Sequence, residues 1–155
     1  MALKVYIAYG NSVDQVIALR LQALAAVNGL SVYVPPAYTR QPTSALDPQS
    51  DARLRESDVI IGVITVAISG ACRQELNMAT GLRKNTIVIA TPGLASWLES
   101  YFPGNLVVID PLDPAAAEEG IVQFLKKAEI EQNAKKALLA LGTLALGLWL
   151  FTRQD

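Results

Sequence analysis

The fold of this chain is decided by Ser57–Thr65, SDVIIGVIT, and by Ser69–Ala79, SGACRQELNMA, which follows after a short gap. The first stretch holds a continuous run of β-branched and small apolar residues between polar ends, which predicts a strand covered on both faces. The second begins with Ser69, a good helix N-cap, and continues with apolar residues at helical spacing. We therefore predict a buried strand, a short loop and a helix.

The predicted helix carries one carboxylate, Glu75, in its second turn. Its apolar face would hold Cys72, Leu76, Ala79 and Leu82, with Glu75 at the edge of that face. A carboxylate that borders an apolar helix face, close to the carboxyl end of a central strand, lies where α/β proteins keep their chemistry. Glu75 is therefore the candidate catalytic residue, although a Glu in the second turn of a helix is more often a solvated charge.

Apolar runs and helical patterns alternate along the rest of the chain. The predicted strands cover residues 4–9, 30–34, 57–65, 86–90 and 106–109. The predicted helices cover about 11–27, 47–56, 69–82, 94–101 and 113–129, and residues 37–46 form a polar loop without periodicity. Near-continuous apolar strands that alternate with helices predict a parallel sheet with helices on both faces. We expect an α/β, flavodoxin-like three-layer domain with a five-stranded sheet in the order 2-1-3-4-5.

The first helix is predicted to be capped by Asn11 or Ser12 and to end at Asn28–Gly29. Apolar residues at helical spacing predict the face that packs on the sheet: Val13, Val16, Ile17, Leu21, Leu24 and Val27. We expect the charges of Asp14, and those of Asp51 and Arg53 further along, to lie on solvated helix faces.

The strand order places the topological switch point between the first and third strands, where the crevice should be lined by residues 9–12 and 65–69. Backbone N–H groups at helix starts bind phosphate, so Ser69 and the turn Gly10-Asn11-Ser12 are candidates for binding phosphate or ribose. Tyr9 and Tyr38 are candidates for stacking on a ring, although a Tyr at the end of a strand is more often a core or rim residue.

The composition excludes several classes of site. The chain has 155 residues, of which 52% are apolar, no His and one Cys. Without His, nucleophiles activated by His and His-ligated zinc are excluded, and Cys72 alone cannot build a thiolate metal site. We expect Cys72 to be a small core residue, and a single Cys agrees with a reducing compartment. A net charge of −1 without a basic stripe argues against nucleic acid as a partner.

The C-terminal segment differs from the rest. We divide the chain into an α/β domain at 1–129, a linker at 130–136, a hydrophobic helix at 137–152 and a tail at 153–155. Residues 137–152 have no polar face, which indicates burial in protein or in lipid. As a helix they would span roughly 24 Å, and flanking Lys and Arg side chains would extend that reach towards the hydrocarbon thickness of about 30 Å.

We predict that this helix is a membrane anchor, with lysines before it that keep the domain on the cytoplasmic side. The N-terminus shows no secretory signal. The alternative is a helix that oligomerises or packs on a neighbouring subunit.

The residues resemble a Toll/interleukin-1 receptor (TIR) domain over roughly positions 3 to 128. Val5–Gly10, VYIAYG, resembles the family's opening strand, and the apolar strand ending at Thr65 resembles its third. Ser69–Leu76, SGACRQEL, resembles the signature Ser-x-Trp-Cys-x-x-Glu-Leu, with Ala71 in place of the aromatic residue. Ala8 likewise replaces the usual serine.

The resemblance implies one of two activities. Some TIR domains are modules that recruit other TIR domains, and the 35–46 loop corresponds to a segment used in assembly and site gating. Others cleave or cyclise NAD⁺ as a substrate, with no cofactor required, and the glutamate that matches Glu75 is their catalytic residue. The chain also resembles nucleoside deoxyribosyltransferases and nucleotide N-glycosidases. These families share the helical Glu and an apolar strand that follows a Lys, such as Lys84 in this chain.

Overall fold

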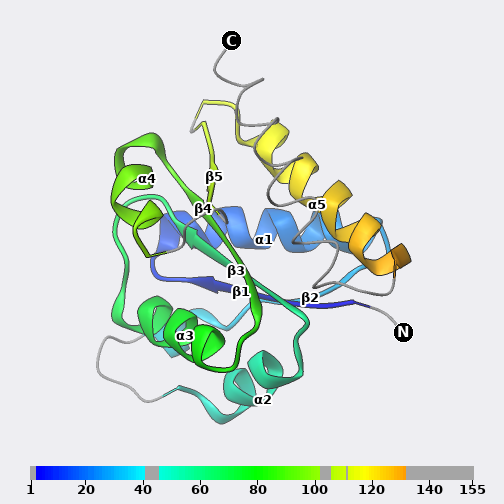
Figure 1. Ribbon diagram of the computed structural model, residues 1–155, viewed down its shortest axis with the longest axis horizontal. Helices are drawn as coiled ribbons and strands as arrows, with labels where there is room; N and C mark the ends of the chain where they lie inside the picture. The colour runs from blue at the N-terminus through cyan, green and yellow to red at the C-terminus, as the bar shows by residue number, and fades with distance from the viewer. Residues whose placement is uncertain (1–2, 41–45, 102–105, 111, 132–155) are drawn as a thin grey trace.

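The computed structural model describes residues 3–40, 46–101, 106–110 and 112–131. They contain a five-stranded parallel sheet in the order β2-β1-β3-β4-β5, which confirms the predicted flavodoxin-like α/β topology (Figure 1). The strands are β1 (Lys4–Tyr9), β2 (Ser31–Tyr33), β3 (Val59–Ile64), β4 (Asn85–Ala90) and β5 (Leu106–Val108). Because the central strands run parallel, their carboxyl ends lie at the same edge of the sheet, where the crevice was predicted.

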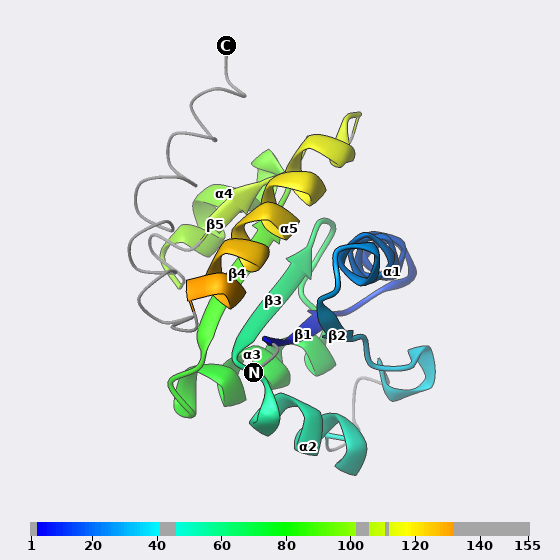
Figure 2. The same cartoon turned by 90° about the vertical axis from the view of Figure 1, so that its right-hand side faces the viewer.

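Helices cover both faces of the sheet (Figures 1 and 2). The helices are α1 (Ser12–Val27), α2 (Pro48–Glu56), α3 (Gly70–Gly81), α4 (Pro92–Glu99) and α5 (Pro114–Glu131). Buried residues of α1 and α5 pack on one face, and those of α2, α3 and α4 pack on the other. One difference from the prediction is a short 3₁₀ helix, η1 (Ala37–Arg40), within the expected loop.

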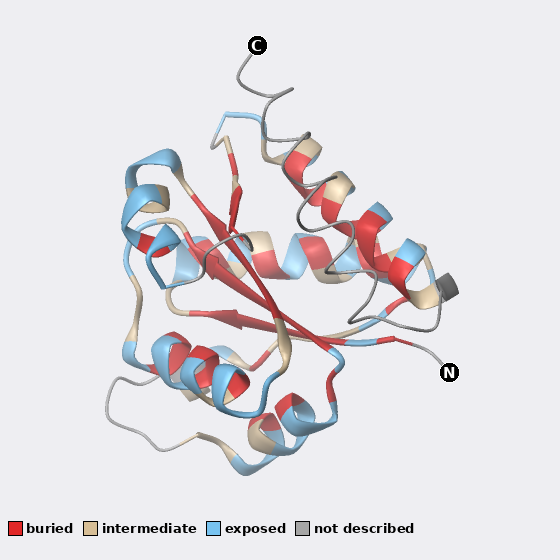
Figure 3. Ribbon diagram, viewed as in Figure 1, coloured by how far each residue is buried: buried red, intermediate tan, exposed pale blue. Residues whose placement is uncertain are grey.

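The register of the central strands decides which side chains meet which helices. Tyr6 of β1 lies beside Ile60 of β3, and Ile7 lies beside Ile61. Because side chains alternate along a strand, Tyr6 and Ile60 face α3, whereas Ile7 and Ile61 face α1 and α5. Figure 3 shows these strands buried along nearly their whole length.

The buried face of α1 differs from the prediction. Asp14, Ala18, Leu21 and Ala25 are buried, whereas Val13, Val16 and Val27 are exposed. The prediction of the packing face was therefore wrong for those three valines, while Ile17 and Leu24 are partly buried against the core. Apolar residues occupy most of the circumference of α1, so periodicity alone could not select a face. Small side chains at 18 and 25 let the helix approach the sheet closely.

An ion pair joins α1 to α5 on this side of the sheet. Arg20 Nη2 lies 3.2 Å from Glu118 Oε1, and the Glu118 side chain is almost fully buried. Burial raises the pKa of the Glu118 carboxyl, and the Arg20 charge opposes that rise.

No helix in the part of the chain that the structure describes is long and apolar enough to cross a membrane. The predicted anchor at 137–152 lies outside the described residues, as do positions 132–136 of the predicted linker and the tail at 153–155. α5 runs to Glu131, so the last helix of the domain extends into the segment that was predicted to be linker.

Candidate functional site

Glu75 is the most unusual residue of α3 because a carboxylate lies in the middle of its buried face. Its exposed fraction is 0%, and Cys72, Leu76 and Ala79 are buried on the same side of the helix. The predicted position at the edge of the face was therefore wrong, and so was Leu82, which is exposed after the helix has ended. The spacing 72, 75, 76, 79 is itself a complete helical stripe, so Glu75 belongs within it.

Tyr6 holds the Glu75 carboxylate from the sheet. The Tyr6 hydroxyl donates a hydrogen bond to Glu75 Oε2, and both side chains are fully buried. Tyr6 comes from the middle of β1, so this bond joins the strand to α3 across the interior. A buried carboxylate needs such donors because its desolvation is costly.

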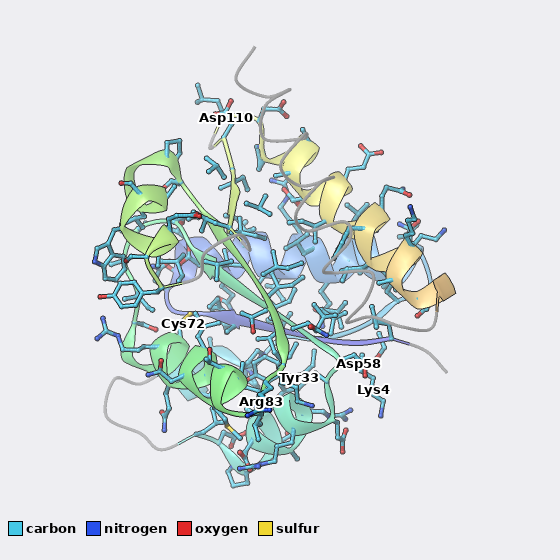
Figure 4. All side chains as sticks on the ribbon, viewed as in Figure 1. Lys4, Tyr33, Asp58, Cys72, Arg83 and Asp110 are labelled. Atoms are coloured by element: carbon cyan, nitrogen blue, oxygen red, sulfur yellow. The ribbon has the colours of Figure 1, made fainter. Side chains whose placement is uncertain are left out.

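A second layer of aromatic and polar groups lies behind Tyr6. The rings of Tyr6 and Tyr33 are 5.4 Å apart, and the Arg53 guanidinium lies 5.7 Å from the centre of the Tyr33 ring. The Tyr33 hydroxyl also lies 3.1 Å from Ser50 Oγ at the start of α2. Tyr33 and Cys72 lie on the side of the sheet that α2 and α3 cover (Figure 4). This packing fixes the Tyr6 ring, and with it the direction of its hydroxyl.

The loops after β1 and β3 meet at the predicted switch point. A Cβ on Gly10 would lie 2.4 Å from Ser69 Oγ and 2.6 Å from Ser69 Cβ, so only glycine allows this approach. The predicted proximity of the 9–12 and 65–69 segments is therefore seen at Gly10 and Ser69, whereas a crevice lined by these segments stays a prediction. The helix that carries Glu75 begins at this contact.

The candidate phosphate-binding residues cap the two helices. Asn11 Oδ1 accepts from the Asp14 backbone N–H at 2.9 Å, and Ser69 Oγ accepts from the Cys72 N–H at 3.1 Å. Asn11, rather than Ser12, is thus the N-cap of α1, and Ser69 caps α3 as predicted. Ser12 is an exposed first residue of α1.

The two candidate stacking residues are in different situations. Tyr9 is buried in the core that faces α1 and α5, on the opposite face of the sheet from Glu75. Its hydroxyl donates to the Pro35 carbonyl oxygen at 2.6 Å, which ties the end of β1 to the segment after β2. Tyr38 belongs to η1, which packs against α3, but its side chain is outside the described part of the structure.

The prediction that Asp14 lies on a solvated helix face was wrong. Its exposed fraction is 0%, and its Oδ1 accepts from the Thr65 backbone N–H at 3.1 Å and from the Thr65 hydroxyl. The Thr91 hydroxyl donates to the Thr65 carbonyl oxygen at 3.0 Å, so the ends of β3 and β4 are linked to α1. Asp14 Oδ2 has no hydrogen-bond partner in the described structure.

Burial raises the pKa of the Asp14 carboxyl above its ordinary value of 3.8, although the bonds from Thr65 and Asn11 oppose that rise. The expected solvation holds better for Arg53, which is exposed, and for Asp51, which is partly exposed.

Sequence reasoning missed Tyr6 and Asp14 as parts of this region. Tyr6 could have been found from strand alternation, since it lies on the same face of β1 as Ala8. Asp14 gave a weaker signal, because an acidic residue in the first turn of a helix is ordinarily a solvated partner of the helix dipole. Cys72 is buried as expected, and the described residues contain no cluster suited to a metal ion.

Comparison with known proteins gives a distant structural likeness and no match at the level of sequence. No protein-family model matches the sequence, and no curated protein matches it. Among solved structures, the chain is similar to the TIR domains of the activated Roq1 resistosome directly recognising the pathogen effector XopQ. The two share 12% identity with a TM-score of 0.46, over 96% of this chain and 84% of that chain. Function therefore has to be argued from the residues of the site themselves.

Proposed function

We propose that this chain is a TIR-type NAD⁺ glycohydrolase or cyclase in which Glu75 is the essential carboxylate. The observation that carries the proposal is the burial of Glu75 within an otherwise apolar stripe of α3, with a tyrosine hydroxyl aimed at it. A buried carboxylate is less favourable for stability than an apolar side chain of similar volume. A residue that breaks the local packing pattern in this way is characteristic of a functional site.

The chemistry suits a site without His. Nicotinamide leaves NAD⁺ as a neutral molecule, so its departure needs no general acid. The transition state resembles an oxocarbenium ion, which a carboxylate facing the anomeric carbon stabilises electrostatically or traps covalently. Glu75 would hold the ribose hydroxyls and face that carbon, and Tyr6 would act as a positioning residue through its hydrogen bond. The metal-free, cofactor-free reaction uses NAD⁺ only as substrate.

Access to Glu75 connects this chemistry with assembly. Its exposed fraction of 0% means that a ribose can reach it only when neighbouring residues move. η1 packs against α3 and lies within the 35–46 loop, which the TIR resemblance associates with gating and self-association. We therefore propose that activity depends on assembly of several copies, in an immune or signalling role.

Nicotinamide release from NAD⁺ tests the proposal directly. We expect Glu75→Gln to lower turnover by at least about a hundredfold, because the amide carries no charge to offset the cation. Tyr6→Phe should lower turnover less, because the carboxylate remains and only its orientation is lost. Glu119→Gln, which changes an exposed carboxylate on α5, is the matched control and should leave turnover unchanged.

Thermal unfolding of each variant separates loss of chemistry from loss of fold. A folded Glu75→Gln protein with unchanged turnover would remove Glu75 from the mechanism. Turnover of nucleosides or nucleoside monophosphates with indifference to NAD⁺ would instead favour an N-glycosidase or deoxyribosyltransferase.

The second candidate function is a non-enzymatic TIR–TIR signalling module. It is favoured by the same burial, because a carboxylate bonded to Tyr6 within the core can also serve as a purely structural pair. This function predicts assembly that depends on concentration, survives Glu75→Gln and fails when Pro35 or Arg40 is substituted. The absence of NAD⁺ turnover in assembled protein would select it.

A further inference from the structure

A cavity of about 210 Å³ lies between α3 and α4, outside the buried Glu75 site. Leu76 of α3 and Leu98 of α4 are its buried apolar residues, and Ile68 lines it from the loop before α3. Trp97 and Tyr101 are its aromatic residues, with exposed fractions of 43% and 62%. Aromatic rings that stay this accessible above an apolar floor leave a binding surface uncovered.

The two aromatic side chains pair with one another at one wall of the cavity. Their ring centres are 5.1 Å apart and their planes are tilted by 59°. They come from positions 97 and 101, one helical turn apart, so both project from the same side of the chain. This arrangement offers the face of one ring and the edge of the other to a third ring.

The wall that α3 forms carries exposed hydrogen-bond donors that have no partner among the described residues. Arg73 and Asn77 lie one turn apart on α3 and line the cavity. Within the described residues, neither side chain makes a hydrogen bond or ion pair, and the indole N–H of Trp97 also has no partner. Among the described residues that line the cavity there is no carboxylate, and Arg73 supplies a positive charge.

We propose that this cavity binds a small aromatic acid, a single planar ring that carries one carboxylate. An apolar cavity of about 150 Å³ holds one benzene molecule, so 210 Å³ accommodates one ring and a small substituent. The ring would pack on Trp97 over Leu76 and Leu98. The carboxylate would accept two parallel hydrogen bonds from the Arg73 guanidinium, the planar geometry that Arg offers to carboxylates.

The volume also separates this ligand class from nucleotides. A nucleoside monophosphate adds a ribose and a phosphate to its base, and ligand sites for molecules of that size are about 300 Å³ or larger. Glu75 is not among the described residues that line the cavity, and its carboxylate is bonded to Tyr6 of β1. The proposal therefore goes beyond the proposed NAD⁺ chemistry and does not depend on it.

Tryptophan fluorescence of the full chain measures the binding. The sequence has two tryptophans, and Trp149→Phe leaves Trp97 as the only one. We expect benzoate to change the Trp97 emission saturably, with a dissociation constant on the order of 1 mM or lower. Benzamide has the same ring without the charge, and its affinity should be lower than that of benzoate by about tenfold or more.

Two variants in the same background locate the site. Arg73→Gln should weaken benzoate binding about tenfold or more and leave benzamide unaffected, because only the charge-assisted bonds are lost. Lys127→Gln, which removes an exposed positive charge from α5, should leave both ligands unaffected.

Three results would overturn the proposal: emission that responds to benzoate only linearly, equal affinity for benzoate and benzamide, or tighter binding of adenosine monophosphate than of benzoate. Nicotinamide release from NAD⁺ is assayed separately, so its absence would leave the binding result intact.

Discussion

At the scale of single residues, Glu75 and Asp14 are the two carboxylates of the described part whose exposed fraction is 0%, and they lie on opposite faces of the sheet. Glu75 faces β1 from α3 and is held by Tyr6, whereas Asp14 faces the end of β3 from α1 and is held by Thr65. The sequence singled out the first through its motif and assigned the second to solvent. The difference shows that a carboxylate's role depends on which donors the fold brings to it, because only those donors offset its desolvation.

Asp14 gives a prediction about pH. Its pKa is raised by burial, so the folded state favours the protonated form. Its contribution to stability is therefore fully present below the ordinary value of 3.8 and is lost as the pH rises through the folded-state pKa. We expect Asp14→Asn to gain free energy of unfolding relative to the unsubstituted protein between pH 4 and pH 7, because Asn cannot ionise.

Urea unfolding across that pH range measures the difference in free energy of unfolding between the two proteins. Because Glu118 is present in both, its contribution cancels in this difference. Glu119→Gln is the control, because it removes an ionisable carboxylate that is exposed rather than buried. The prediction would be contradicted if the difference in free energy of unfolding between Asp14→Asn and the unsubstituted protein stayed constant from pH 4 to pH 7.

At the scale of elements, the approach of two loops sets the position of α3. Gly10 after β1 touches Ser69 before α3, and Ser69 in turn caps the helix that carries Glu75. Ser69 was predicted as a cap from its place before an apolar helical pattern, and that prediction is confirmed. The close contact with Gly10 was not predictable, because it depends on how the β1 and β3 loops meet.

This contact predicts a rescue experiment. Gly10→Ala should lower the free energy of unfolding by about 1–3 kcal/mol, because its Cβ would overlap the Ser69 side chain. Ser69→Gly alone should cost only a few tenths of a kcal/mol, since glycine is a tolerated N-cap. The double variant should recover most of the loss, because no side chain remains at position 69.

A double-mutant cycle on urea unfolding gives the coupling between the two positions. Gly93→Ala serves as the matched glycine control, since nothing lies within 4 Å of a Cβ at that position. Additive effects of the two substitutions at 10 and 69 would show that the contact does not limit the fold.

At the scale of the whole molecule, the exposed apolar residues of the described part are scattered over several helices. Val13, Val16 and Val27 lie on α1, and Trp97 and Tyr101 lie at α4 and just after it. The sequence also contains the apolar segment 137–152, which lies outside the described residues. We propose that this segment anchors the protein in a membrane with the α/β domain on the cytoplasmic side.

Fractionation of the full chain and of a chain ending at Gln132 tests the anchor. We expect the full chain to sediment with membranes and to need detergent for release, whereas the shortened chain should remain in the supernatant. Confinement to a surface would raise the effective concentration of the domain and favour assembly. A full chain that stays soluble and monomeric without detergent would refute the anchor and assign the segment to packing within the protein.

The sequence by itself determined the order of strands and helices, because β3 is a continuous apolar run and turn and cap residues mark the ends of its neighbours. It also determined the candidate carboxylate, since Glu75 belongs to a motif of fixed spacing. Both are local properties that follow from periodicity and capping chemistry.

Only the tertiary structure decided which face of α1 is buried, that Tyr6 bonds to Glu75 and that Asp14 bonds to Thr65. Each of these joins residues that are distant in sequence or selects one face of a helix that is apolar nearly all round. The free energy of burial depends on the neighbours that the whole fold supplies, and no local pattern of residues contains that information.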